Sequence, residues 1–260
     1  MSDPDQQLPS VLFVGGSDPT HGAGLDADRD AAHAFECDGR YVTSAETDQD
    51  LFEVRSVDER LLWHRDAADR LAERPAAAIK LGLLSGVASI VEAARLVARS
   101  RNARPAVPAV VDPVISSSSG YRFWSDRELT AARDSLLVAG PVLTPNLDEL
   151  AELAWADREA LDASDDERVR AAQALIEGGA SAVVAKGGHG PEGEPVRDLV
   201  LEPGAAPVWI ERERVPGPGI RGSGCRFAAA LACALARGQS LADATDAAGR
   251  FVAARIRGDE

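Results

Sequence analysis

The amino-acid sequence predicts one α/β domain over residues 1–260, in which helices cover both faces of a mostly parallel central sheet. Short apolar runs alternate along the chain with segments whose apolar residues recur every three or four positions. Apolar residues make up 45% of the chain and aromatic residues only 5%, which is typical of an interior built from Ala, Val and Leu. No repeat or long linker divides the chain, and residues 1–9 are expected to be a flexible N-terminus.

Each predicted strand is a short apolar run, and each is followed by a helical pattern, as in units of two parallel strands joined by a helix. The strand candidates are 11–16, 41–45, 77–84, 109–115, 142–146 and 182–188. The helical segments between them are 23–36, 56–73, 89–101, 125–139 and 165–179. Residues 198–203 and 208–215 predict a hairpin at one edge of the sheet, and two helices beginning near Gly224 and Ser240 close the chain.

Charge and cysteine content exclude several classes of protein. The net charge of −14 argues against a nucleic-acid partner, because binding to phosphate backbones is driven by Lys and Arg. The three cysteines, Cys37, Cys225 and Cys233, lack the CxxC spacing of a zinc site and are odd in number, so a reducing compartment is expected. No apolar stretch approaches the length of a membrane span, and the first residues are acidic where a signal peptide would be basic. We therefore expect a soluble cytoplasmic protein.

Lysine is nearly absent from the chain. Lys80 and Lys186 are the only two lysines among 28 lysine and arginine residues. Because the ammonium group is compact and flexible where guanidinium is a planar fork, these two positions indicate a specific need for lysine. Chance is the alternative.

Glycine-bearing polar segments follow the predicted strands. They are GGSDPTHGAG after the first strand, DPV in the fourth, TPNLDE after the fifth and KGGHG after the sixth. Ligands of parallel sheets collect outside the carboxyl ends of the strands, so these segments predict one shared site. Each segment taken alone is also what an ordinary strand-to-helix turn uses.

A glycine-rich loop precedes the penultimate helix. Residues 217–222 satisfy G-x-G-x-x-G, but only helical sequence follows, so the dinucleotide-binding interpretation fails for lack of a second parallel strand. The sequence GSGC at 222–225 instead predicts a cradle of backbone N–H groups for an anion at a helix N-terminus. The same field is expected to lower the pKa of Cys225, which makes its thiol a candidate base. The alternative is a small residue filling a gap, which is the interpretation preferred for Cys233.

Seven motifs, in order along nearly the whole chain, resemble those of one known family. They are GGSDPTHGAGLDAD (15–28), TDQD (47–50), IKLGLL (79–84), VVDPV (110–114), TPNLDE (144–149), KGGH (186–189) and GSGC (222–225). The family is the hydroxymethylpyrimidine/phosphomethylpyrimidine kinases of thiamine biosynthesis, in the ribokinase-like superfamily. The resemblance implies a ribokinase-like three-layer sandwich, ATP and Mg²⁺ as cofactors, a small aminopyrimidine alcohol and its phosphate as substrates, and a homodimer.

The resemblance also implies a role for each matching residue. Asp28 and Gln49 would hydrogen-bond the aminopyrimidine, whose pocket Gly16 and Leu83 would line. Cys225 would accept the hydroxyl proton while the amides of residues 222–225 (Gly222, Ser223, Gly224 and Cys225) hold the developing charge. Lys186 would approach the ATP phosphates, and Asp112, Asn146 and Glu149 would hold or orient Mg²⁺ through water. The alternatives are helix capping by Asp28, Asn146 or Glu149 and a solvent-exposed Gln49.

Several positions depart from the family pattern. Arg221 stands where His is usual, Arg226 where Thr is usual, and His21 where Gly is usual. The two arginines would strengthen phosphate binding or block the pocket, and His21 would crowd the pyrimidine. The loop SSSSGYRF at 116–123 replaces a segment that often carries Lys or a glycine run, and its contacts are left unassigned. Two alternatives therefore stay open: a pyridoxal-type kinase of the same superfamily, and a catalytically impaired pyrimidine-binding regulatory protein.

Overall fold

The computed structural model describes residues 7–50, 52–103, 107–188, 190, 193–217 and 219–259. Most of the predicted flexible N-terminus and His189 of the KGGH motif lie outside these ranges. Within them the strands form one sheet in the order β3-β2-β1-β4-β5-β6-β7-β8-β9. The strands are β1 (Ser10–Ser17), β2 (Asp38–Gln49), β3 (Val54–Glu59), β4 (Ala78–Leu81), β5 (Ala109–Val111), β6 (Val142–Leu143), β7 (Ala182–Ala185), β8 (Val196–Leu201) and β9 (Val208–Arg212).

The centre of the sheet, from β2 to β7, is parallel, and β3, β8 and β9 are antiparallel. The predicted fold class is therefore confirmed, as is the predicted hairpin, formed by β8 and β9. Strand β3 was not predicted: the helix expected over 56–73 begins within it. Residues 54–59 are mostly polar, and they form a strand because the edge of β2 opposite β1 offers free backbone groups.

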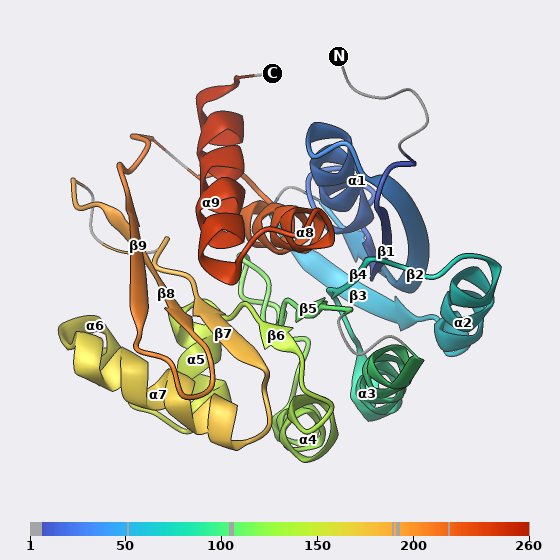
Figure 1. The fold of residues 1–260 in the computed structure, drawn as a ribbon, viewed down its shortest axis with the longest axis horizontal. Helices are drawn as coiled ribbons and strands as arrows, with labels where there is room; N and C mark the ends of the chain where they lie inside the picture. The colour runs from blue at the N-terminus through green and yellow to red at the C-terminus, as the bar shows by residue number, and fades with distance from the viewer. Residues whose placement is uncertain are drawn as a thin grey trace.

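Helices cover both faces of the sheet (Figure 1). One face carries α1 (Gly24–Ala34), α8 (Ser223–Ala236) and α9 (Leu241–Arg257), and the other carries α2 (Trp63–Glu73), α3 (Gly86–Ala103), α4 (Asp126–Ala131), α5 (Leu147–Ala154), α6 (Arg158–Ala163) and α7 (Asp165–Glu177). Strand β1 shows why both faces are needed. Leu12 and Val14 point into the core beside α2 and α3, while Val11 and Phe13 point into the core beside α1 and α8.

Two helical regions differ from the sequence prediction. The segment predicted as one helix over 125–139 is α4 followed by a π-helical turn, η1 (Ala132–Leu137). Helices α5 and α6 were not predicted as separate elements, because each spans fewer than three turns and leaves little periodicity to detect. Among the described residues, no helix is both long and apolar enough to cross a membrane.

The carboxyl ends of the parallel strands bring the polar segments together. Asp112 follows β5 directly, Asn146 lies three residues after β6, and Lys186 follows β7. A backbone bridge pairs Asn146 with Lys186 just beyond the two strands. Helix α8 begins on the same edge of the sheet and packs on β4 and β5. This edge therefore positions the site.

Candidate active site

A cavity of about 730 Å³ opens at this edge of the sheet. Nearly all of the residues selected from the sequence line it: Gly16, Gln49, Leu83, Asp112, Asn146, Glu149, Lys186, Gly222, Ser223, Gly224 and Cys225. Asp28 does not. The cavity is large enough for a nucleotide and a second small molecule side by side.

The start of α8 forms one wall of the cavity. Gly222, the residue that precedes the helix, has φ +72°, and no side chain caps the first helical amides. A Cβ atom on Gly222 would lie 2.5 Å from the carbonyl oxygen of Gly22, so only glycine fits there. A Cβ atom on Gly224 would lie 3.3 Å from Nζ of Lys186. The Ser223 N–H donates to the backbone carbonyl of Ile220 at 3.3 Å, and no side chain caps this first turn, which faces a lysine. This is the arrangement of an anion site.

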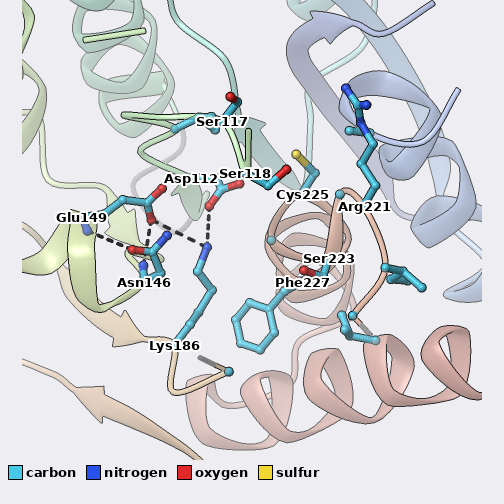
Figure 2. Close-up of a pocket in the computed structure, with 18 of the residues that line it drawn as sticks. Asp112, Ser117, Ser118, Asn146, Glu149, Lys186, Arg221, Ser223, Cys225 and Phe227 are labelled. Atoms are coloured by element: carbon cyan, nitrogen blue, oxygen red, sulfur yellow. Dashed lines mark hydrogen bonds and ion pairs between the residues drawn. The ribbon is translucent and has the colours of Figure 1, made fainter. Parts of the chain in front are cut away.

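Lys186 lies between two carboxylates on the opposite wall (Figure 2). Its Nζ donates to Oδ1 of Asp112 at 2.8 Å and lies 4.0 Å from Oε2 of Glu149. Burial acts to lower the pKa of Lys186, but Asp112 and Glu149 raise it above its ordinary value, so the group is a cation. Burial raises the pKa of Glu149 to about 8, although Lys186 opposes this shift.

Asn146 and Glu149 form a capping box at the start of α5. The Asn146 side chain accepts from the Glu149 amide at 2.9 Å, and Oε2 of Glu149 accepts from the Asn146 amide at 2.7 Å. Helix capping, the alternative considered for both residues, is therefore what these atoms do in the structure.

The carboxylates suit magnesium. The described residues contain no group of three or more His, Cys, Asp or Glu side chains arranged to hold a metal ion. Asp112 and Glu149 supply hard carboxylate oxygens beside the anion site. Mg²⁺ usually keeps several water ligands and takes only one or two carboxylates, the rest coming from phosphates. The donor set therefore fits a magnesium ion held largely through water.

Cys225 lies at the first turn of α8 and lines the cavity, half-buried. The expected lowering of its pKa is wrong. Burial raises the pKa of the thiol, and Asp112 and Asp28 raise it further, while Lys80 lowers it. Burial and the two carboxylates outweigh the helix field, so the resting group is a thiol. Cys233 is fully buried in the core, which confirms its packing role.

Asp28 does not lie where the resemblance implied. Its side chain is fully buried beneath the cavity, where Oδ1 accepts from Nζ of Lys80 at 2.8 Å. Asp28 is not among the residues that line the cavity, whereas its partner Lys80 is. The rarity of lysine was the sequence signal for this position. Gln49, at the end of β2, is half-buried and does line the cavity.

The departures from the family pattern have distinct positions. His21 is exposed, pairs with Asp26 at 2.7 Å and is not part of the lining, so it does not crowd the cavity. Its φ of +59° lies in the left-handed region, which explains why Gly is usual there. Arg221 lines the rim and donates to the backbone carbonyl of Asp50 at 2.5 Å.

Arg226 is not part of the cavity lining. It donates to Oδ2 of Asp30 at 3.0 Å and to the backbone carbonyls of Gly22 and Arg221, both at 2.9 Å. Arg255 from α9 binds the same Asp30 carboxylate. Arg226 therefore does not block the pocket, and its hydrogen bonds join the first loop to the start of α8.

Sequence reasoning missed the wall on the side of α9. Phe227 of α8 and Val252, Ala253 and Ile256 of α9 add an apolar surface to the cavity. The α9 residues carried no signal because they read as one more amphipathic helix.

Comparisons with known proteins agree with this geometry. The family model described as phosphomethylpyrimidine kinase matches residues 18–260. A hydroxymethylpyrimidine/phosphomethylpyrimidine kinase of Streptomyces coelicolor is 35% identical and is aligned over 95% of this chain and 88% of its own length. The protein of the same name from Bacillus subtilis is 31% identical, and the alignment covers 93% of this chain and 87% of that protein.

Two groups of solved structures are similar. Pyridoxal kinase from Staphylococcus aureus in complex with ADP superposes with a TM-score of 0.83 and 27% identity, over 96% of this chain and 89% of that one. Phosphomethylpyrimidine kinase from Clostridium difficile superposes with a TM-score of 0.76 over 96% of this chain and 100% of that one. At 23% identity the second similarity shows the fold alone.

Proposed function

The chain belongs to the phosphomethylpyrimidine kinase family, and from that premise we propose that it phosphorylates 4-amino-5-hydroxymethyl-2-methylpyrimidine and then its monophosphate, with ATP as donor, in thiamine biosynthesis. The enzyme is a phosphotransferase. One observation carries the proposal: the uncapped start of α8 faces the Asp112–Lys186 pair across a single cavity, with Cys225 in the first turn. Phosphoryl transfer needs little more than positioned groups that align and neutralise phosphates.

The ATP phosphates are assigned to the space between α8 and Lys186. The amides of Gly222, Ser223, Gly224 and Cys225 would hold the charge that develops on the transferred group. Lys186 would contribute its positive charge from the opposite wall. The apolar surface from Phe227 and α9 suits the flat faces of adenine.

Magnesium is assigned to the carboxylate side of the cavity. Asp112 and Glu149 would hold the ion through water, and Asn146 would keep Glu149 in place through the capping box. Bound there, the ion supplies positive charge that neutralises the phosphates during transfer.

The pyrimidine is assigned to the space between Gly16, Gln49 and Leu83. The Gln49 amide can accept from the 4-amino group and donate to a ring nitrogen. A Cβ atom on Gly16 would lie 2.8 Å from the Leu83 side chain, so glycine lets Leu83 close that wall. Asp28 would act on the site only through Lys80.

Cys225 is assigned the proton of the acceptor hydroxyl. The new bond joins that oxygen to the γ-phosphorus, the bond from phosphorus to the ADP oxygen breaks, and the proton passes to Sγ in its thiolate form. Cys225 is well placed for this step because its sulfur is directed into the cavity beside the amide cradle (Figure 2).

The test is an assay of ADP release with the pyrimidine alcohol, its monophosphate and pyridoxal as separate acceptors. We expect turnover with both pyrimidines and kcat/KM for pyridoxal at least about tenfold lower, a difference of about 1.4 kcal/mol. Turnover with pyridoxal alone would assign a pyridoxal-type kinase, the second candidate, which is favoured by the similarity to pyridoxal kinase. Tight pyrimidine binding by calorimetry without turnover would indicate a regulatory protein instead.

We also propose a cytoplasmic homodimer without nucleic-acid partners. The free cysteines among the described residues suit a reducing compartment, and the net charge of −14 disfavours nucleic acid. Sedimentation equilibrium measures the oligomeric state, and a monomer at micromolar concentration would contradict the homodimer.

A further inference from the structure

Two buried charged groups lie beneath the cavity and have no role in the mechanism so far. Lys80 extends from β4 and Asp28 from α1, and their side chains, 2.8 Å apart, are both 0% exposed. Lys80 is nevertheless one of the residues that surround the cavity, whereas Asp28 is not. Burying an ion pair costs free energy unless both groups make enough hydrogen bonds, so the burial of this pair needs an explanation.

The pair is incomplete. Only Oδ1 of Asp28 bonds to Lys80, and Oδ2 is buried without a hydrogen-bond partner among the described residues. Gly82 makes room for the ammonium, since a Cβ atom there would lie 2.7 Å from Nζ. The ammonium therefore has a carboxylate partner that it does not fully satisfy.

Cys225 is the third member of this cluster. Cys225 lines the same cavity as Lys80, and the backbone N–H of Gly24, the first residue of α1, acts to lower the pKa of its thiol. Asp28 lies one turn further along that helix. Helix α8 packs against both α1 and β4, the elements that carry Asp28 and Lys80. The thiol, the ammonium and the carboxylate therefore lie on three elements of which α8 packs against the other two.

We propose that Lys80 is a positioning residue for phosphoryl transfer: its buried ammonium is shared by two acids, Asp28 and Cys225, and is the counter-ion that makes the Cys225 thiolate available. The proposal rests on the proposed function only in taking Cys225 as the proton acceptor. The thiol proton leaves to water in the open cavity, Lys80 stabilises the thiolate, and the acceptor hydroxyl then returns a proton to Sγ.

The charges around Cys225 support this sharing. Burial raises the pKa of Asp28 to about 6 even though Lys80 lowers it, so the carboxylate is a weak competitor for the ammonium. Burial acts to lower the pKa of Lys80, but Asp28 and Cys225 raise it. From the other walls of the cavity, the negative charge of Asp112 opposes ionisation of the Cys225 thiol, and the positive charge of Lys186 favours it. One cation thus faces two acids from within the core, and removing one acid should favour ionisation of the other.

The test measures the rate at which iodoacetamide alkylates Cys225 from about pH 6 to 10, because only the thiolate reacts. Peptide mass spectrometry separates Cys225 from the buried Cys37 and Cys233. Asp28→Asn should lower the apparent pKa of Cys225 by about one unit or more and raise its rate near neutral pH about tenfold. Lys80→Met should shift the pKa in the opposite direction by a similar amount, and the double variant should behave like Lys80→Met.

The two variants should shift the pKa of Cys225 in opposite directions if the ammonium is shared. Loosened packing would instead expose Cys225 in both variants alike. Ser89→Ala is the matched control, because it removes a buried acceptor from Trp63 away from the cavity and should leave the alkylation profile unchanged. If the pKa of Cys225 is unchanged or raised in Asp28→Asn, the proposal is overturned. Asp28→Asn is isosteric, so its result is sufficient for the test if Lys80→Met fails to fold. Alkylation needs no turnover, so the result is independent of the kinase assay.

Discussion

Gly222→Ala is the substitution that most directly tests the anion cradle. The new Cβ atom would lie 2.5 Å from the Gly22 carbonyl oxygen and 2.8 Å from the Cα of Ala23. Both contacts are with backbone, so no side-chain rotation relieves them, and the loop must move away from α8 by about 1 Å to restore an ordinary contact. A misplacement of that size costs about 10²-fold in rate.

Gly238→Ala is the control for backbone strain alone. Gly238 follows α8 with φ +83°, and a Cβ atom there would have no neighbour within 4 Å. The free energy of unfolding of Gly238→Ala should fall only by the cost of an alanine in the left-handed conformation, about 1–2 kcal/mol. The variant should keep its activity. Gly222 has a similar φ of +72°. The free energy of unfolding of Gly222→Ala should therefore fall by that amount plus the cost of the clash, about 2–4 kcal/mol in all.

The two variants are compared by urea unfolding and by kcat/KM for ATP at saturating acceptor. We expect a fall of about 10²-fold for Gly222→Ala and wild-type kinetics for Gly238→Ala. If Gly222→Ala keeps kcat/KM within threefold of wild type, the start of α8 does not hold the phosphoryl group and the reasoning is refuted.

Four further outcomes are expected. Cys225→Ala should lower kcat about 10²-fold or more with little change in KM for ATP; an unchanged kcat would remove Cys225 from the reaction. Chelation of divalent ions should abolish ADP release and Mg²⁺ should restore it, and activity that survives chelation would contradict the assignment of magnesium. Arg226→Met should lose about 1–3 kcal/mol of stability but leave KM for ATP within about twofold, because Arg226 joins loops and does not bind phosphate; a tenfold rise in KM would show the opposite. Burial acts to raise the pKa of Asp30, but hydrogen bonds from Arg255 and Arg226 lower it, so Asp30 stabilises the fold above pH 4 and this contribution is lost as the pH falls further; the difference in unfolding free energy between wild type and Asp30→Asn should shrink below about pH 4, and a constant difference would argue against the ion pair.

The sequence predicted well where the signal is local. Alternating apolar runs and helical periods placed the strands, and β1 alone shows the two faces that these patterns require. The sequence failed at β3, whose polar residues form a strand only because β2 offers an unpaired edge. It also failed to separate α4 from the π-helical turn that follows, since both share one apolar pattern. A strand that is held by backbone pairing with its neighbour, and not by burial of its own side chains, leaves little apolar pattern in its residues.

The same division holds within the candidate site. Residue order and strand ends determined by themselves which side chains could gather at one edge of the sheet, because parallel strands place their carboxyl ends together. Only the tertiary structure decided what those groups do to one another. It buried Asp28 against Lys80, engaged Asn146 and Glu149 in a helix cap, and raised the pKa of Cys225. Burial and charge act through distances in space, and one sequence read along its length does not contain those distances.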